Sequence, residues 1–91
     1  MPKYFFDIHD GCAIRDDIGR NIEGGGILRA EAVKVATMLM REEAETGNET
    51  TLVLTVRDEA GGTPLTVRLV CQVSENRPIV PHKYDQVFPI R

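Results

Sequence analysis

Two runs of alternating apolar and polar residues, separated by four residues, predict a β-hairpin in the second half of the chain. The runs are Thr51 to Asp58 and Thr63 to Val73. Side chains of a strand alternate between its two faces, so a period of two marks a half-buried strand. A four-residue loop keeps like residues opposite each other, whereas a five-residue loop would place Leu54 opposite Thr66. The expected pairs are therefore Val56 with Leu65, Leu54 with Val67, Leu52 with Leu69 and Thr55 with Thr66.

A second hairpin is expected near the N-terminus. Residues Lys3 to His9 also alternate, and an Asp-Gly turn follows them. A three-residue loop after this strand would place Ile8 opposite Ile14 and Asp7 opposite Arg15. That register pairs apolar with apolar and acid with base, so we favour it over a two-residue loop.

The middle of the chain predicts one helix. A turn at residues 16–20, with Gly19 at positive φ, and a short sheet extension at Asn21 to Glu23 are expected before it. Three glycines then offer no strong N-cap. From Ile27 to Thr46 the apolar residues recur at helical spacing along one stripe. The members of this stripe are Leu28, Ala32, Val35, Ala36, Leu39 and Met40. Met38 is the exception, because it lies on the polar side of the helix.

Together these elements predict a two-layer α+β domain over residues 1–73, in the order ββαββ. Four strands would form one antiparallel sheet, with the helix on one face. Val53, Val70 and Thr66 would lie on the other face, which would then need a cover. Residues 74–91 contain three prolines that exclude a helix or a central strand, yet they are too apolar for a solvated tail. We expect them to extend over their own sheet or over a partner.

Composition excludes several classes of function. The 91 residues carry a net charge of −3 with dispersed cations, which disfavours binding to a phosphate backbone. No apolar run approaches the ~20 residues of a membrane-spanning helix, so we expect no membrane attachment. Met1 and Pro2 lead directly into the first strand pattern, so we expect no secretory signal. Cys12 and Cys71 lie far apart, outside any CxxC spacing. We therefore expect a cytoplasmic protein with both cysteines reduced and at least half-buried. No cofactor motif is present, so we expect no cofactor.

An ordered set of short motifs resembles a known family. The motifs are Tyr4-Phe5-Phe6 after Met1-Pro2, Asp10-Gly11, Asp16-Asp17 with Gly19, the Ala-rich helix, and Val56 to Gly61 before an apolar strand. Over roughly residues 2 to 70 the chain is similar to a family of short bacterial proteins of unknown function. It departs from that family at the three glycines before the helix. The resemblance implies no activity, cofactor or catalytic residue.

We favour a protein-interaction or homo-oligomerising module, because the pattern leaves apolar residues without a cover. The candidate interaction surface consists of Met38, Val53, Val70, Ile79, Val80 and Phe88. A symmetric homodimer through the sheet or the tail is the commonest solution for such a surface.

Two alternatives use polar residues. Arg57 and Arg68, with Lys3 and an exposed Phe5, could bind single-stranded nucleic acid on the open sheet face. Asp7 and His9, together with the carboxylates of the two turns, could hold a divalent metal. Each has a simpler explanation, because turns and ion pairs account for the acids and solvated strands account for the arginines. The pattern therefore leans away from an enzyme.

Overall fold

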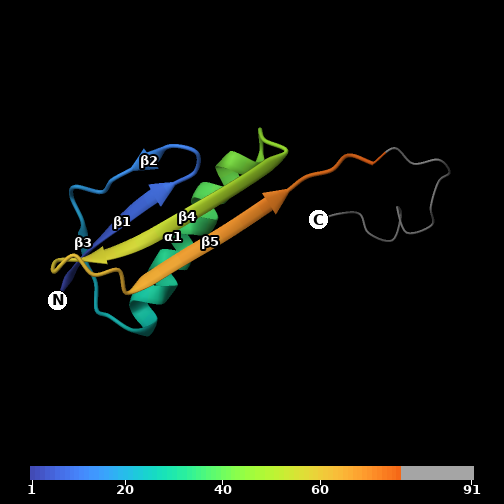
Figure 1. Cartoon of the computed structure of the whole chain (residues 1–91). Helices are drawn as coiled ribbons and strands as arrows, with labels where there is room; N and C mark the ends of the chain where they lie inside the picture. The colour runs from blue at the N-terminus through green and yellow to red at the C-terminus, as the bar shows by residue number, and fades with distance from the viewer. Residues whose placement is uncertain (77–91) are drawn as a thin grey trace.

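The computed structural model describes residues 1–76 and confirms the α+β fold (Figure 1). The elements are β1 (Lys3–His9), β2 (Ala13–Ile14), β3 (Arg20–Asn21), α1 (Gly26–Ala44), β4 (Glu49–Asp58) and β5 (Leu65–Gln72). The sheet has the order β2-β1-β4-β5, and β3 pairs with β1 as a short fifth strand beyond the four expected. All pairs are antiparallel, and the β1–β4 pairing joins the two predicted hairpins.

The registers of both hairpins follow the predicted pattern. All four expected pairs of the β4–β5 hairpin are present, and so is the pair of Ile8 with Ile14. The expected pair of Asp7 with Arg15 was wrong. The β1–β2 ladder ends at Ile14, and Asp7 instead forms an ion pair with Arg57 of β4. Charge alternation alone could not distinguish these two partners for Asp7, because both are arginines.

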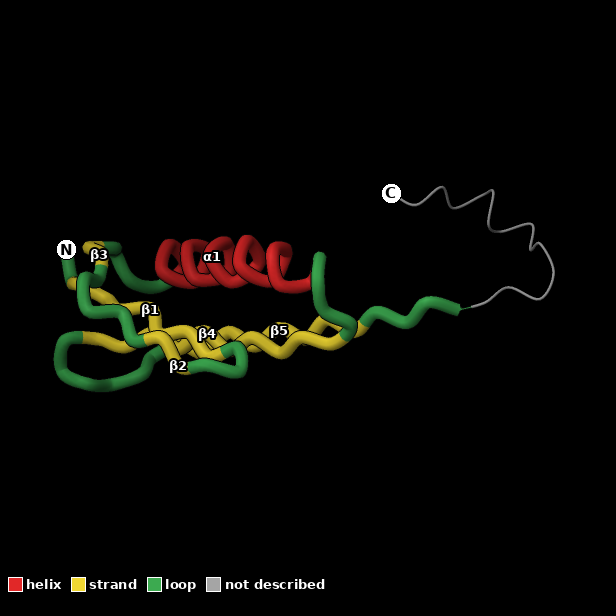
Figure 2. The backbone as a smooth tube through the Cα atoms, turned by 90° about the horizontal axis from the view of Figure 1, so that it is seen from above, coloured by secondary structure: helices red, strands yellow, loops and turns green. Residues whose placement is uncertain are grey.

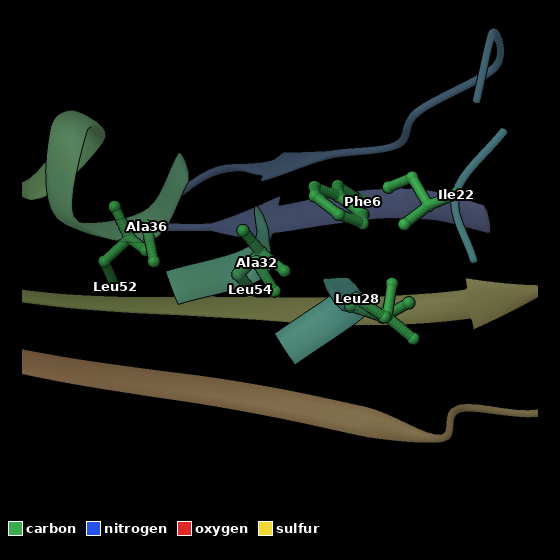
Figure 3. Packing of buried hydrophobic residues seen from close by; sticks show 8 residues of the cluster. Phe6, Ile22, Leu28, Ala32, Ala36, Leu52 and Leu54 are labelled. Carbon is green, nitrogen blue, oxygen red and sulfur yellow. The ribbon is translucent and has the colours of Figure 1, made fainter. Parts of the chain in front are cut away.

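The hydrophobic core lies between α1 and one face of the sheet (Figure 2, Figure 3). Leu52, Leu54 and Val56 of the central strand are fully buried, and Ala32 and Ala36 of α1 pack over them. Alanine at these two helix positions lets the helix approach the sheet closely. Phe6, Ile22 and Leu28 complete the buried set. Among the described residues, no element covers the opposite face of the sheet.

The helix begins one residue earlier and ends two residues earlier than predicted. Gly25 precedes it with a φ of 66°, and no side chain caps its first turn, as the glycine run indicated. A turn follows Ala44, and in it the Gly47 N–H donates to the Glu43 carbonyl at 3.3 Å. The strand β4 then starts two residues before the predicted boundary. Three of the proposed contact residues in the tail, Ile79, Val80 and Phe88, lie outside the described residues.

Candidate functional site

The uncovered side of the sheet, which we call the open face, carries most of the candidate residues. The registers arrange them in rows across β1, β4 and β5. Phe5 faces Arg57, Asp7 faces Thr55 and Thr66, and His9 faces Val53 and Arg68, while Thr51 faces Val70. Asp7 and His9 are thus brought near Val53, as neighbours on one surface. Arg57 and Arg68 lie in different rows, so they form no joint basic patch.

A hydrogen-bonded network occupies one end of the open face. The Arg57 guanidinium donates to both Asp7 carboxylate oxygens, at 2.9 and 3.3 Å. It also donates to the Asp16 backbone carbonyl at 3.0 Å. The Asp16 backbone N–H in turn donates to Asp7 at 2.9 Å. Arg57 of the central strand therefore ties β1 to the loop that follows β2.

Where the edge strand is interrupted, the Asp16 side chain accepts a hydrogen bond that a backbone carbonyl of the edge strand would otherwise accept. Five residues, 15–19, separate the ladder positions of β2 and β3, whereas three residues, 5–7, separate their partners on β1. The two extra residues make a bulge in the edge strand. Within it the Asp16 carboxylate accepts the Phe6 N–H at 3.0 Å, the Ile18 N–H at 2.9 Å and the Gly19 N–H at 3.0 Å. A single carboxylate thus closes the bulge and satisfies three backbone donors.

Both carboxylates of this network are held in the ionised form. The hydrogen bond from Arg57 is the main reason that the pKa of Asp7 lies below its usual value. Burial opposes the ionisation of Asp16, but the N–H donors of Phe6, Gly19 and Ile18 outweigh that effect and lower the pKa of Asp16. The same ion pair raises the pKa of Arg57. Each charge therefore has a structural partner.

The aromatic candidate for base stacking is already in contact with protein groups. The Arg57 guanidinium carbon lies 4.5 Å from the centre of the Phe5 ring, in cation–π contact. Gly19, at a φ of 75°, lies so close to Phe5 that an added Cβ would come within 2.8 Å of the ring. The positive φ predicted for Gly19 is confirmed, and the close approach explains why no side chain fits there. Phe5 and Arg57 contact each other, so neither side chain is free to contact a nucleic acid.

The proposed metal ligands do not converge. Asp7 and Asp16 direct their carboxylates to Arg57 and to backbone donors, and His9 is exposed at the end of β1. Over residues 1–76, no group of three or more His, Cys, Asp or Glu side chains could hold a metal ion. Cys12 is a free thiol exposed in the first hairpin turn, so the expectation that it is buried was wrong. Cys71 is half-buried and also free.

The apolar candidates divide between the two layers of the fold. Val53 and Val70 are diagonal neighbours on the open face, because Val53 pairs with Arg68, two residues from Val70. Val70 is 59% exposed. Met38 is equally exposed but lies on α1, in the other layer. The described part of the predicted interaction surface therefore consists of two separate regions.

One apolar surface was missed by the sequence pattern. A groove of about 410 Å³ lies beside α1, at the edge of the sheet formed by β2 and β3. Its apolar lining residues are Phe6, Ile8, Ile14, Ile18 and Val35, and its charged lining residues are Arg15, Asp16, Asp17 and Arg20. Arg20 also contacts the Phe6 ring at 4.6 Å and pairs with Glu31 of the helix at 3.1 Å. The signal in the sequence was Ile18, an aliphatic residue inside an otherwise polar turn.

The comparisons with known proteins identify the family of the chain. Within residues 1–76, none of the helices has the length and apolar character needed to cross a bilayer. The search of curated proteins gave no match, and the search of solved structures gave none either. One family model, described as Domain of unknown function (DUF6894), matches residues 3–70. That match spans most of the chain, from β1 into β5, and nearly coincides with the stretch that carries the motif resemblance. The chain is therefore a member of the DUF6894 family of domains of unknown function.

Proposed function

We propose that this chain is a protein-interaction domain and that its first partner is another copy of itself. The observation that carries the proposal is where the exposed aliphatic side chains lie. Ile14 and Ile18 are 57% and 83% exposed at one edge of the sheet, and Val70 and Val73 are 59% and 42% exposed at or beyond the other. Apolar residues gathered at sheet edges favour association, because an edge also presents unpaired backbone groups.

The expected free energy of association is modest. Fully burying a large aliphatic side chain stabilises a complex by roughly 1.5–3 kcal/mol, and these residues are already partly covered. A few such residues, offset by the entropy lost on association, correspond to the weaker range of specific complexes. We therefore expect a dimer with a Kd in the micromolar to submillimolar range.

The contacts of Phe5 and Asp7 argue against the two alternatives. A single-stranded nucleic-acid site would need Phe5 and Arg57, which contact each other. A metal site would need Asp7, which accepts two hydrogen bonds from Arg57. We also propose that the protein works in the cytoplasm, where an exposed free thiol such as Cys12 stays reduced.

The test is sedimentation velocity on the full chain, from about 1 µM to about 1 mM, which brackets association free energies of about −8 to −4 kcal/mol. We expect the weight-average mass to rise from that of the monomer toward that of the dimer. A mass that stays monomeric over the whole range would contradict self-association. A matched run at high salt checks that the association does not depend on surface charges.

A further inference from the structure

The outer side of β5 presents a regular row of backbone donors and acceptors. The Val73 N–H donates to the Asn48 carbonyl at 2.7 Å, which shows that odd-numbered residues here point their backbone groups toward β4. Successive residues of a strand point these groups to opposite sides. The even-numbered residues Thr66, Arg68, Val70 and Gln72 therefore direct their N–H and C=O groups away from β4. Within residues 1–76, β5 has β4 as its one neighbour in the sheet.

The two edges of the sheet differ in how they are protected. The β2–β3 edge is broken by the bulge, and the Asp16 carboxylate caps the Phe6 N–H that a neighbouring strand could otherwise use. Bulges and charged residues are the usual devices that block pairing between sheet edges. The β5 edge is continuous over eight residues, has no proline within it, and carries one charged residue, Arg68. It is thus the edge that remains competent to pair.

We propose that β5 pairs antiparallel with β5 of a second copy, about a two-fold axis that passes through Leu69. This inference rests on the proposed self-association and names the surface that performs it. In this register Leu69 faces Leu69 of the second copy. Val67 faces Cys71 and Leu65 faces Val73 on the helix side of the sheet. Arg68 faces Val70 and Thr66 faces Gln72 on the open face. The result is a continuous sheet across two copies, with both helices on the same side.

The sequence of β5 is self-complementary in this register and less so in its neighbours. A two-fold axis at Arg68 would place two arginines directly opposite, which is destabilising. An axis at Val67 would pair Val70 with Pro64, which has no N–H to donate. An axis at Val70 would place Leu65 opposite the charged Glu75 on the helix side of the sheet. The axis at Leu69 avoids all three conflicts and keeps every helix-side pair apolar. This self-complementarity identifies the occupant as a second copy of the chain.

The first test removes the outward donor of Val70. Val70→Pro deletes an N–H that points away from β4, so the monomer keeps its ladder, as proline on an edge strand allows. Because the dimer contains this residue twice, we expect the dimer Kd to rise about 10-fold or more. Val70→Lys provides a second edge variant, because a charge on an edge strand opposes pairing. Thr51→Lys is the matched control, since it adds the same charge in the same row, on the central strand.

Sedimentation of these variants separates the inference from the function on which it rests. A wild-type chain that stays monomeric would contradict both. A wild-type dimer that is weakened by the two Val70 variants and retained in Thr51→Lys supports pairing through β5. A wild-type dimer that survives both Val70 variants, or that is lost equally in Thr51→Lys, would overturn the β5 contact while leaving self-association intact. Thermal unfolding by circular dichroism checks that each variant is folded.

The second test fixes the register by a disulfide. In a background of Cys12→Ser and Cys71→Ser, Leu69→Cys places two thiols at a non-hydrogen-bonded antiparallel pair. The Cα atoms of such a pair lie about 4.5 Å apart, within the range for a disulfide. Val67→Cys in the same background is the control, because its two copies would be offset by four residues and their Cα atoms would lie about 14 Å apart. We expect mild oxidation to cross-link Leu69→Cys alone. Cross-linking of Val67→Cys instead, or equal cross-linking of both, would overturn the register.

Discussion

Replacing Asp16 with alanine tests whether this carboxylate holds the interrupted edge strand. Asp16 accepts hydrogen bonds from the N–H groups of Phe6, Ile18 and Gly19 at 2.9–3.0 Å. Alanine would remove all three acceptors at once. The Phe6 N–H, at a position within β1, would then depend on water that enters the bulge. We expect β3 and the loop before it to separate from β1 more easily.

The expected loss of stability follows from the hydrogen bonds. A hydrogen bond to a charged group contributes about 1.5–3 kcal/mol when it is shielded from water. The Asp16 side chain is half-buried and two of its donors are in an exposed loop, so each bond is worth less than that. We estimate a total loss of about 2–3 kcal/mol. For a domain of this size, 1 kcal/mol changes the Tm by about 4–8 °C, so the Tm should fall by about 8–24 °C.

The assay is urea unfolding followed by circular dichroism, with Asp17→Ala as the matched control. Asp17 is the next residue, its side chain is 86% exposed, and within residues 1–76 its one ion pair, with Arg15, spans 3.9 Å. An exposed pair of this kind contributes between 0 and about 1 kcal/mol, so Asp17→Ala should barely change the free energy of unfolding. Asp16→Asn retains one acceptor oxygen and should fall between the two. Equal stabilities for Asp16→Ala and Asp17→Ala would refute the anchoring role.

Three further predictions concern the fold. Gly19→Ala should lower the free energy of unfolding by about 2–4 kcal/mol, because backbone strain adds to a clash with the Phe5 ring. Gly61→Ala, also at positive φ but with open space around it, should show the strain alone, about 1–2 kcal/mol; equal losses would contradict the contact with Phe5. Leu54→Ala should cost about 2–5 kcal/mol in urea unfolding because Leu54 is fully buried, and a loss below about 1 kcal/mol would show that the core is placed wrongly. The lowered pKa values of Asp7 and Asp16 stabilise the fold above about pH 4, and this contribution should disappear as the pH falls below that value. In thermal melts, Asp7→Asn should reduce the fall of the Tm below about pH 4. An unchanged fall would contradict the stabilising role of the ionised Asp7 carboxylate.

The hairpin registers were predictable because the alternation of apolar residues determines which residues can lie opposite each other. In the β4–β5 hairpin, a shift of one residue would have moved Leu54 from the core to the open face, so one loop length satisfied the pattern. The β1–β4 contact was not predictable in the same way. Both strands alternate, and the residues that separate them give no loop constraint. The strand order therefore required the structure.

The network around Arg57 shows why the candidate site was only partly predictable. The sequence indicated that Asp7 has a basic partner, but an ion pair between residues fifty positions apart leaves no local signal. Asp16 was assigned to a turn, and its turn hydrogen bonds to Ile18 and Gly19 fit that assignment. Its bond to Phe6, which closes the bulge, depends on two extra residues in the edge strand. A bulge is a feature of pairing between strands, and composition does not encode it.

Met38 and Val70 were predicted to be exposed, whereas the exposure of Ile14 and Ile18 was missed. Met38 stood out because it broke the helical pattern, and the structure leaves it exposed on α1. Ile14 and Ile18 were read as residues of a strand and a turn. Their joint exposure beside α1 follows from how the helix sits on the sheet, which periodicity does not specify.

The most direct test of pairing through β5 is amide hydrogen exchange measured at low and high protein concentration. The amides of Thr66, Arg68, Val70 and Gln72 should exchange rapidly in the dilute monomer, because they point away from β4. Pairing through β5 predicts that all four become protected at concentrations where the dimer forms, while the odd-numbered amides of β5 are protected throughout. Rapid exchange of those four amides in a sample that sedimentation shows to be dimeric would contradict pairing at this edge.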